Sequence, residues 1–230
     1  MGDPKKGGEG VSTITSAFHR AARVSRADLY GISPDQQLPA YLTTDARTPF
    51  LGFVGHKFTA GGVVLLAINP GGGGKAYQHR PPQDQEILPL IEAFVCSAAT
   101  EASRCFRAMS NNYAKQVQTW NLWRILNPVL QACDKELSEI VFLNCFPYRT
   151  AGDRMPQVLA LRASWVTIIE PLLAELKPNK VIALGKKAGG VAKRYFRGPG
   201  QLYVVPRTIG DTWLCPEAED VLKSLREIAT

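Results

Sequence analysis

The most continuous apolar run of the chain, Val63-Val64-Leu65-Leu66-Ala67-Ile68, predicts a strand that is buried on both faces of a parallel sheet. Asn69-Pro70 ends this strand, because proline removes a ladder donor and disfavours helical geometry in the residue before it. Four glycines follow, and they let the backbone come close to a bulky group: Gly71, Gly72, Gly73 and Gly74. Since open α/β sheets bind ligands beyond the carboxyl ends of their strands, we expect a ligand site here.

Strand and helix patterns alternate along the rest of the chain. Further apolar runs predict strands at residues 140–146, 181–184 and 201–205, and residues 50–58 are a candidate edge strand. Helical spacing of apolar residues predicts helices over residues 12–29, 84–109, 116–133, 157–176 (kinked at Pro171), 186–196 and 215–229. This alternation predicts a three-layer α/β/α fold with a central, mainly parallel four-stranded sheet.

The ends and connections of this fold have their own composition. Residues 1–10 are rich in glycine, lysine and acids, so we expect a disordered tail there and a single domain over residues 11–230. Residues 31–49 are rich in proline, aspartate and threonine, which predicts an extended loop.

Composition narrows the class of protein. With 45% hydrophobic and 20% charged residues the chain is typical of soluble globular proteins, and no apolar run is long enough to cross a bilayer. The start of the chain lacks a signal-peptide pattern, and the five cysteines form no C-x-x-C pair. We therefore expect reduced thiols, no metal, no membrane partner and a cytoplasmic location, associated with the nucleoid if the protein is bacterial.

The net charge of +7 is unevenly distributed. No acid occurs between Glu175 and Asp211, and that window contains eight basic residues: Lys177, Lys180, Lys186, Lys187, Lys193, Arg194, Arg197 and Arg207. A second window, between Glu101 and Asp134, is also free of acids and contains four: Arg104, Arg107, Lys115 and Arg124. Such clustering indicates a nucleic-acid partner, and a solvated helix face is the alternative.

The glycine run does not match a nucleotide-binding motif. A P-loop needs a glycine where Asn69 stands, and Ser or Thr where Ala76 follows Lys75, so its magnesium ligand is missing. A dinucleotide fingerprint is nominally met by Gly71, Gly73 and Ala76, but it needs a helix that starts there, and Pro81-Pro82 blocks one.

Four segments that end the predicted strands or connect them resemble, in order, the uracil-DNA glycosylase superfamily. They are Ala67-Ile68-Asn69-Pro70-Gly71, similar to a G-[IM]-N-P-G motif of its mismatch-specific and single-strand-selective members; residues 141–147; residues 165–188; and Val204-Val205-Pro206-Arg207-Thr208. The resemblance covers roughly residues 60–229. It implies a uracil-DNA glycosylase-like fold, and a monomeric, monofunctional enzyme of base excision repair that needs no cofactor.

The resemblance also assigns roles to residues. Asn69 would hold the attacking water, and Asn144 would pair with the edge of a flipped uracil, since an amide offers both a donor and an acceptor. Ile68, Pro70, Tyr77 and Arg207 would complete the base site. The DNA backbone would lie against these residues: Gly71, Gly72, Gly73, Gly74, Lys75, Gly185, Lys186, Lys187 and Thr208. Asn69 capping a turn, Asn144 bonding backbone and the lysines serving solubility are the alternatives.

The chain departs from the family pattern at two places. No histidine follows His79, so Arg207 stands where the family has the histidine that bonds the leaving base. No aromatic residue stands near Pro81-Pro82, where the ring that stacks on the base is expected; Tyr77 is the first candidate and His79 the second. Trp213 or Leu214 could fill the space that the flipped base leaves, although an aromatic there is more often core.

Three hypotheses therefore follow from the sequence. The first is a DNA glycosylase that removes uracil, or a related deaminated base, from DNA. The second is a non-catalytic protein of the same fold that binds DNA or abasic sites. The third is a small-molecule α/β enzyme that binds a phosphorylated ligand at the glycine loop.

Overall fold

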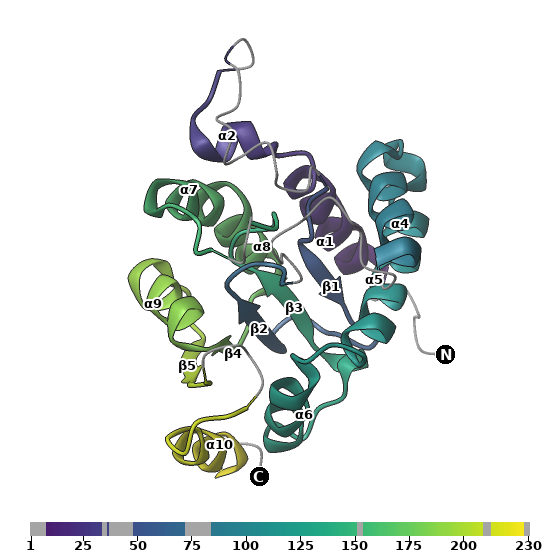
Figure 1. The fold of residues 1–230 in the computed structure, drawn as a ribbon. Coiled ribbons are helices and arrows are strands. Elements are labelled where there is room, and N and C mark those ends of the chain that lie inside the picture. The colour runs from purple at the N-terminus through teal and green to yellow at the C-terminus, as the bar shows by residue number, and fades with distance from the viewer. Residues whose placement is uncertain are drawn as a thin grey trace, which may run out of the picture.

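The computed structural model describes residues 8–33, 36, 48–71, 84–150, 154–208 and 213–227. Its centre is a five-stranded sheet in the order β1-β3-β2-β4-β5 (Figure 1). The strands are β1 (Gly52–Val54), β2 (Val63–Ala67), β3 (Val141–Asn144), β4 (Lys180–Leu184) and β5 (Gln201–Val205). Four of them are parallel, and β1 runs antiparallel to β3. The α/β class is confirmed, but the sheet has five strands instead of four because part of the candidate edge segment pairs with β3.

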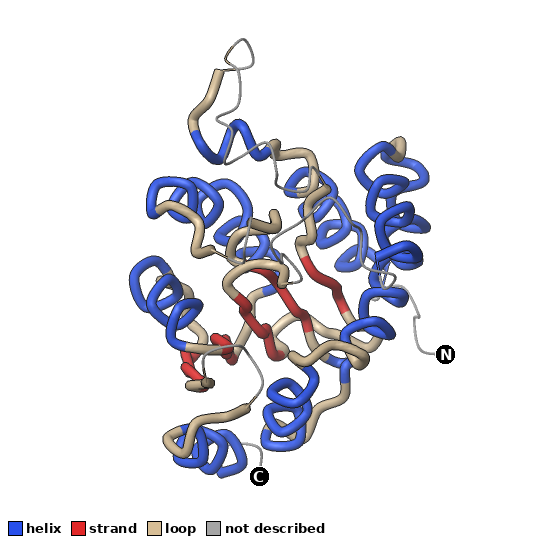
Figure 2. The backbone as a smooth tube through the Cα atoms, in the orientation of Figure 1, coloured by secondary structure: helices blue, strands red, loops and turns tan. Residues whose placement is uncertain are grey.

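Helices fill the connections between the parallel strands. Between β2 and β3 lie α4 (Asp84–Cys96), α5 (Ala99–Val117) and α6 (Trp123–Ala132). Between β3 and β4 lie α7 (Val158–Ser164), the π-helical turn η3 (Trp165–Ile169) and α8 (Glu170–Leu176), and α9 (Lys186–Tyr195) leads to β5. The chain begins with α1 (Gly8–Ala21) and α2 (Arg26–Tyr30), and α10 (Ala218–Glu227) is its last described helix. Figure 2 shows the strands enclosed by these helices.

The strand register places α5 and α9 on opposite faces of the sheet. Phe142 of β3 contacts Tyr113 of α5, with ring centroids 6.2 Å apart. Its neighbour Leu143 is level, through β2 and β4, with Val204 of β5, and a Cβ on Gly189 of α9 would lie 2.4 Å from Val204. Because successive side chains of a strand point to opposite faces, the two helices cover different faces, as in a three-layer α/β/α arrangement.

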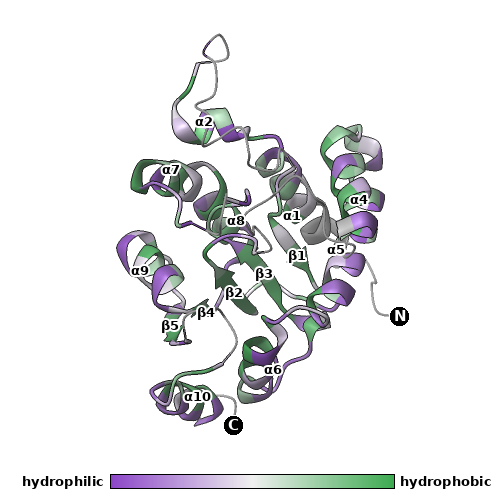
Figure 3. Cartoon of the chain, viewed as in Figure 1, coloured by the Kyte–Doolittle hydropathy of each residue, from purple (hydrophilic) through white to green (hydrophobic). Residues whose placement is uncertain are grey.

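Coverage on both faces explains the continuous apolar run of β2. Every residue of β2 and β3 is buried, and Val64, Leu65 and Leu66 have no exposed surface. Figure 3 shows β2 and β3 as the hydrophobic centre of the sheet. A strand with one solvent face would alternate apolar and polar residues. The continuous apolar run of β2 therefore indicated correctly that both of its faces are buried.

The helix predicted over residues 84–109 is two helices, because tertiary contacts end α4 at Cys96. The Ser97 hydroxyl donates to the Phe94 carbonyl at 2.8 Å. From the turn that follows α1, the Arg23 guanidinium donates to the carbonyls of Val95 and Ser97, at 3.2 and 3.0 Å. These bonds satisfy carbonyls that the end of a helix leaves without partners.

The helix predicted over residues 12–29 is also two helices. Ser25 caps α2: its hydroxyl accepts from the Asp28 N–H at 3.1 Å, and the Asp28 carboxylate accepts from the Ser25 N–H at 2.9 Å. At the other end, α1 begins at Gly8, so the expectation of a disordered tail is wrong for residues 8–10, while residues 1–7 lie outside the described chain. The predicted helices at 116–133 and 215–229 are shorter, as α6 and α10.

The predicted helix over residues 157–176 exists, but its irregular part precedes Pro171. In η3 the Glu170 N–H bonds the Trp165 carbonyl, five residues back. A proline cannot donate to the carbonyl four residues before it, and the wider π turn adapts the ladder there. Trp165 packs against Tyr195 of α9, with ring centroids 6.0 Å apart.

Candidate functional site at the carboxyl edge of the sheet

The carboxyl ends of the four parallel strands lie along one edge of the sheet. Ala67 of β2 is level with Asn144 of β3. Beyond the strands, the Cys145 N–H bonds the Ala67 carbonyl at 2.8 Å and the Phe146 N–H bonds the Ile68 carbonyl at 2.9 Å. The segments that follow β2 and β3 therefore continue side by side past the end of the sheet.

The strand order places a topological switch point at this edge. The chain leaves β2 for its neighbour β3 on one side, and it leaves β4, the other neighbour of β2, for β5 on the opposite side. Connections that diverge from two adjacent strands leave a crevice outside their carboxyl ends, where open α/β sheets bind ligands. Asn69 follows β2 and Gly185 follows β4, so the two residues flank the switch point. The ligand site expected from the sequence thus falls at the position that the topology favours.

Asn69 is tied to the segment that follows β3. The amide nitrogen Nδ2 of Asn69 donates to the hydroxyl Oγ1 of Thr150 at 3.0 Å. Thr150 is buried, and its hydroxyl in turn donates to the Arg154 carbonyl. Asn69 is half-buried, so this chain of bonds fixes one side of its amide while the residue stays partly accessible. The amide oxygen is an acceptor that could orient a water molecule.

The Asn144 side chain forms its hydrogen bonds inside the protein, between the sheet and α5. Its side chain is only 1% exposed and lies on the α5 face of the sheet, as does that of Phe142. Nδ2 donates to the Phe50 carbonyl at 2.8 Å and to the Tyr113 hydroxyl at 3.3 Å. Both hydrogens of the amide are thereby engaged within the protein. The pairing of Asn144 with a base stays a prediction, and this geometry favours its alternative, an asparagine that bonds backbone at a strand end.

The segment after β3 is further anchored by two side chains for which sequence reasoning proposed no role. The Tyr148 hydroxyl donates to the Val24 carbonyl at 2.6 Å, and burial raises the pKa of Tyr148 to about 12, so it remains a donor at neutral pH. The guanidinium carbon of Arg149 lies 4.4 Å from the centroid of the Phe50 ring. Tyr148 and Arg149 follow a predicted strand end, which is the signal that could have identified them.

Arg207 lies directly over Gly185. A Cβ on Gly185 would be 2.6 Å from Nε of Arg207, and Gly185 has φ +98° and ψ 160°, which only glycine adopts readily. The Gly185 N–H bonds the Val205 carbonyl at 2.7 Å, so this N–H is directed at β5 and is not available to a phosphate. The ends of β4 and β5 are thereby held together, with the Arg207 side chain across the start of α9.

The other predicted site residues are distributed as follows. Ile68 and Pro70 are buried, whereas Gly71, Lys186, Lys187 and Thr208 are exposed. The Thr208 N–H bonds the Trp213 carbonyl at 2.9 Å. Trp213 is 62% exposed, with the Arg124 guanidinium 5.1 Å from its ring centroid, so it is not core. Gly72, Gly73, Gly74, Lys75, Tyr77 and His79 lie outside the described residues.

The structure thus places Asn69 and Asn144 at adjoining strand ends, where their side chains bond different partners, and it brings Gly185 into contact with Arg207. Among the described residues, no three or more His, Cys, Asp or Glu gather as metal ligands would. No helix in the described part of the chain is long and apolar enough to span a membrane. The described cysteines are all free thiols.

Comparison with known proteins adds no assignment. No protein-family model matches the chain, and no curated protein matches it.

Proposed function

We propose that the protein is a monofunctional DNA glycosylase that hydrolyses the N-glycosidic bond of uracil, or of a related deaminated base, as the first step of base excision repair. One observation carries the proposal: Asn69, of the segment that resembles the glycosylase motif, lies at the switch point of the sheet and is oriented by Thr150. The other resembling segments include the carboxyl ends of β3, β4 and β5, which lie along the same edge.

The proposed reaction requires a flipped base, a positioned water and stabilisation of the departing base. Asn69 would hold the water through its amide oxygen, because its Nδ2 is engaged with Thr150. A neutral amide cannot take up a proton as a carboxylate does, so we expect a slow enzyme. Uracil would leave as an anion, and Arg207, which lies over Gly185 at this edge, is a cation that could stabilise it.

The DNA backbone would run along the basic start of α9. Lys186 and Lys187 are exposed there, and Lys193, Arg194 and Arg197 follow in a window without acids. Cations and a helix N-terminus together attract phosphate. The proposed DNA partner is therefore held by charge, and the base by the segments that follow β2 and β5.

A second function is favoured by one specific observation. Because both Nδ2 hydrogens of Asn144 are bonded to Phe50 and Tyr113, the residue expected to select uracil has no donor to offer a base. A protein that binds DNA or abasic sites without cleaving would need no such donor. A small-molecule enzyme that binds a phosphorylated ligand beside Gly71 is the third alternative.

A labelled oligonucleotide that contains one uracil separates these functions after incubation with the protein and treatment with alkali. Strand cleavage supports the glycosylase, and a gel shift without cleavage supports the binding protein. The absence of both cleavage and a gel shift favours the small-molecule enzyme. Asn69→Ala should abolish cleavage and leave the salt-sensitive gel shift intact, and full activity in that variant would remove Asn69 from the mechanism.

A further inference from the structure

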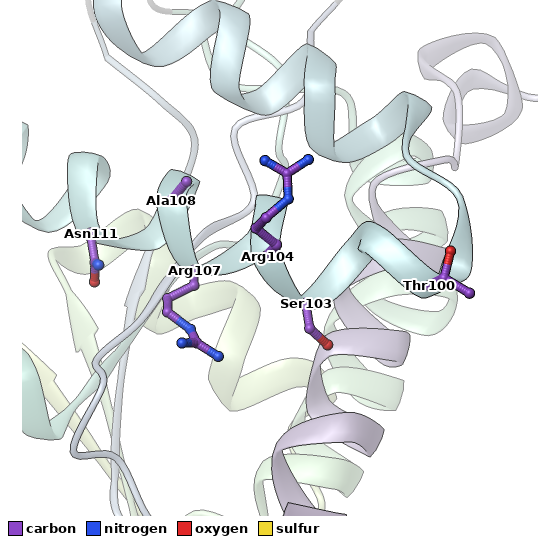
Figure 4. A pocket seen from close by; sticks show the side chains of 6 residues that line it. All are labelled: Thr100, Ser103, Arg104, Arg107, Ala108 and Asn111. Carbon is purple, nitrogen blue, oxygen red and sulfur yellow. The ribbon is translucent and has the colours of Figure 1, made fainter.

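A row of polar and basic side chains runs along the exposed face of α5. Ser103, Arg107, Asn111 and Lys115 are each four residues apart and all exposed, so they lie one above another on the helix. The steps are about 6 Å long and the row about 18 Å. Figure 4 shows Arg107 extending to the same side of α5 as Ser103 and Asn111, whereas Arg104 turns away. We call these four residues the α5 row.

The surface beside the α5 row is hollowed. One hollow of about 470 Å³ is lined by Thr100, Ser103, Arg104, Arg107, Ala108 and Asn111 (Figure 4). A second, of about 390 Å³, lies where α5 faces the end of β1 and the 3₁₀ turn η1 (Leu137–Glu139); its polar lining includes His56, Ser110, Asn111, Lys115, Gln118 and Ser138. Asn111 lines both hollows, so they adjoin each other along α5, and we call the two together the groove.

The groove presents hydrogen-bond donors and no carboxylate among its described lining residues. Arg107 and Lys115 carry no acceptor, and no described residue bonds either of them. Arg104 has one weak, exposed pair with Glu101, at 3.5 Å. Glu136, near the second hollow, is held by Lys57 at 3.5 Å and by the Ser138 hydroxyl at 3.1 Å. The complementary ligand is an anion rich in acceptor oxygens.

The groove is separate from the carboxyl edge of the sheet. Its second hollow lies at the amino end of β3, where the Gly55 N–H bonds the Ile140 carbonyl and the Lys57 N–H bonds the Ser138 carbonyl. Asn144 is at the other end of the same strand, about 13 Å away for four residues. A ligand held at Asn69 would not fill this groove.

We propose that the α5 row binds the phosphate backbone of a nucleic acid, independently of its sequence, as a second contact surface in addition to the one proposed at the carboxyl edge. Phosphates of a polynucleotide repeat along a line, and arginine, lysine, serine and asparagine are side chains that proteins use to contact them. A linear row of donors suits such a backbone better than a single phosphate, which is normally held by a closed cluster. The acid-free window from Glu101 to Asp134 is the sequence counterpart of this surface.

The test measures binding of a fluorescein-labelled 30-base-pair duplex without uracil, by anisotropy from 50 to 200 mM salt. We expect Arg107→Glu/Lys115→Glu to weaken binding about tenfold and to make the slope of log K against log salt shallower by about two. Arg107→Gln/Lys115→Gln should show a smaller loss. The matched control, Lys223→Glu/Arg226→Glu, makes the same charge change on exposed positions of α10.

Equal losses in the α5 and α10 variants would assign the effect to net charge and overturn the proposal. Unchanged binding by the α5 variant would also overturn it, and would leave an acidic protein as the partner of this surface. The absence of duplex binding by the wild-type protein would overturn it as well. A photo-crosslinking amino acid in place of Ala108 should attach to the duplex, and one in place of Lys223 should not. Because the probe contains no uracil, these results do not depend on whether the protein excises that base.

Discussion

Arg207 and Gly185 are fitted to each other: the Nε atom of Arg207 occupies the space that any side chain at position 185 would need. The two residues follow adjacent parallel strands, so this contact joins the ends of β4 and β5 at the carboxyl edge. The position of the Arg207 side chain therefore depends on the absence of a Cβ at Gly185. Gly185 follows β4, which lies two strands from β3, the strand that carries Asn144.

Gly185→Ala should displace the Arg207 side chain and strain the backbone. Since φ is +98° at this glycine, we expect a loss of about 1–3 kcal/mol in the free energy of unfolding. The rate of uracil excision should fall by more than the loss of folded protein explains. Gly190→Ala, in the same helix with open space around its Cα, is the control and should stabilise the protein by about 0.5–1 kcal/mol. Urea denaturation measures the free energy of unfolding, and the excision assay measures the activity. A Gly185→Ala protein with unchanged stability and full activity would show that Arg207 does not depend on this glycine.

Thr150→Val should release the amide of Asn69, because it removes the hydroxyl that accepts from Nδ2 while it preserves the side-chain shape. If Asn69 orients water, the excision rate should fall about tenfold, which corresponds to about 1.4 kcal/mol in the barrier. Thr150→Ser keeps the hydroxyl and should retain most of the rate. DNA affinity, measured by gel shift, should not change in either variant, and equal rates for valine and serine would show that the bond is not needed.

Asn144→Ala should destabilise the fold. It leaves the buried Phe50 carbonyl without its amide donor, and a buried acceptor left so costs about 1–3 kcal/mol. The midpoint of thermal unfolding should therefore drop, whereas Asn121→Ala at an exposed position should leave it unchanged. The opposite pattern, in which stability is kept and excision is lost, would favour the base-pairing role that the resemblance implies.

His19 should make stability depend on pH. Burial, and then the charge of Arg23, lower the pKa of His19 below its ordinary value, so the folded protein holds the ring neutral. The unfolded chain binds a proton near pH 6.5, while the folded one does so only at lower pH. The contribution of His19 to stability is therefore complete above about pH 6.5 and is lost as the pH falls through the lower, folded-state pKa. Melting temperatures from pH 7.5 to 5.0 measure this, and His19→Gln should flatten the slope.

Apolar patterning was enough to predict the four parallel strands, because each is a short apolar run bounded by polar residues, although only β2 and β3 are buried throughout. It also predicted which ends would carry Asn69, Asn144, Gly185 and Arg207. The extra pairing of Gly52–Val54 with β3 was harder to predict, since three residues give too little alternation to distinguish a strand from a loop.

Other features depend on contacts between distant parts of the chain. The break between α4 and α5 depends on Arg23, more than seventy residues earlier. The orientation of Asn144 depends on the Phe50 carbonyl and on Tyr113 of α5, and neither is evident from its own strand. Thr150 bonds Asn69 only because the segments after β2 and β3 continue side by side. By contrast, Ser25 and Asp28 carry a local capping pattern that the sequence does display.

The antiparallel strand β1 has a consequence for how molecules of this protein meet one another. An outermost strand with unpaired N–H groups can template a strand from a second chain and start aggregation. Here the outward N–H of Val54 is directed at the Ser110 hydroxyl of α5, at 3.4 Å, and the strand is only three residues long. Helix α5 therefore hinders a strand from a second chain from pairing with this edge of the sheet.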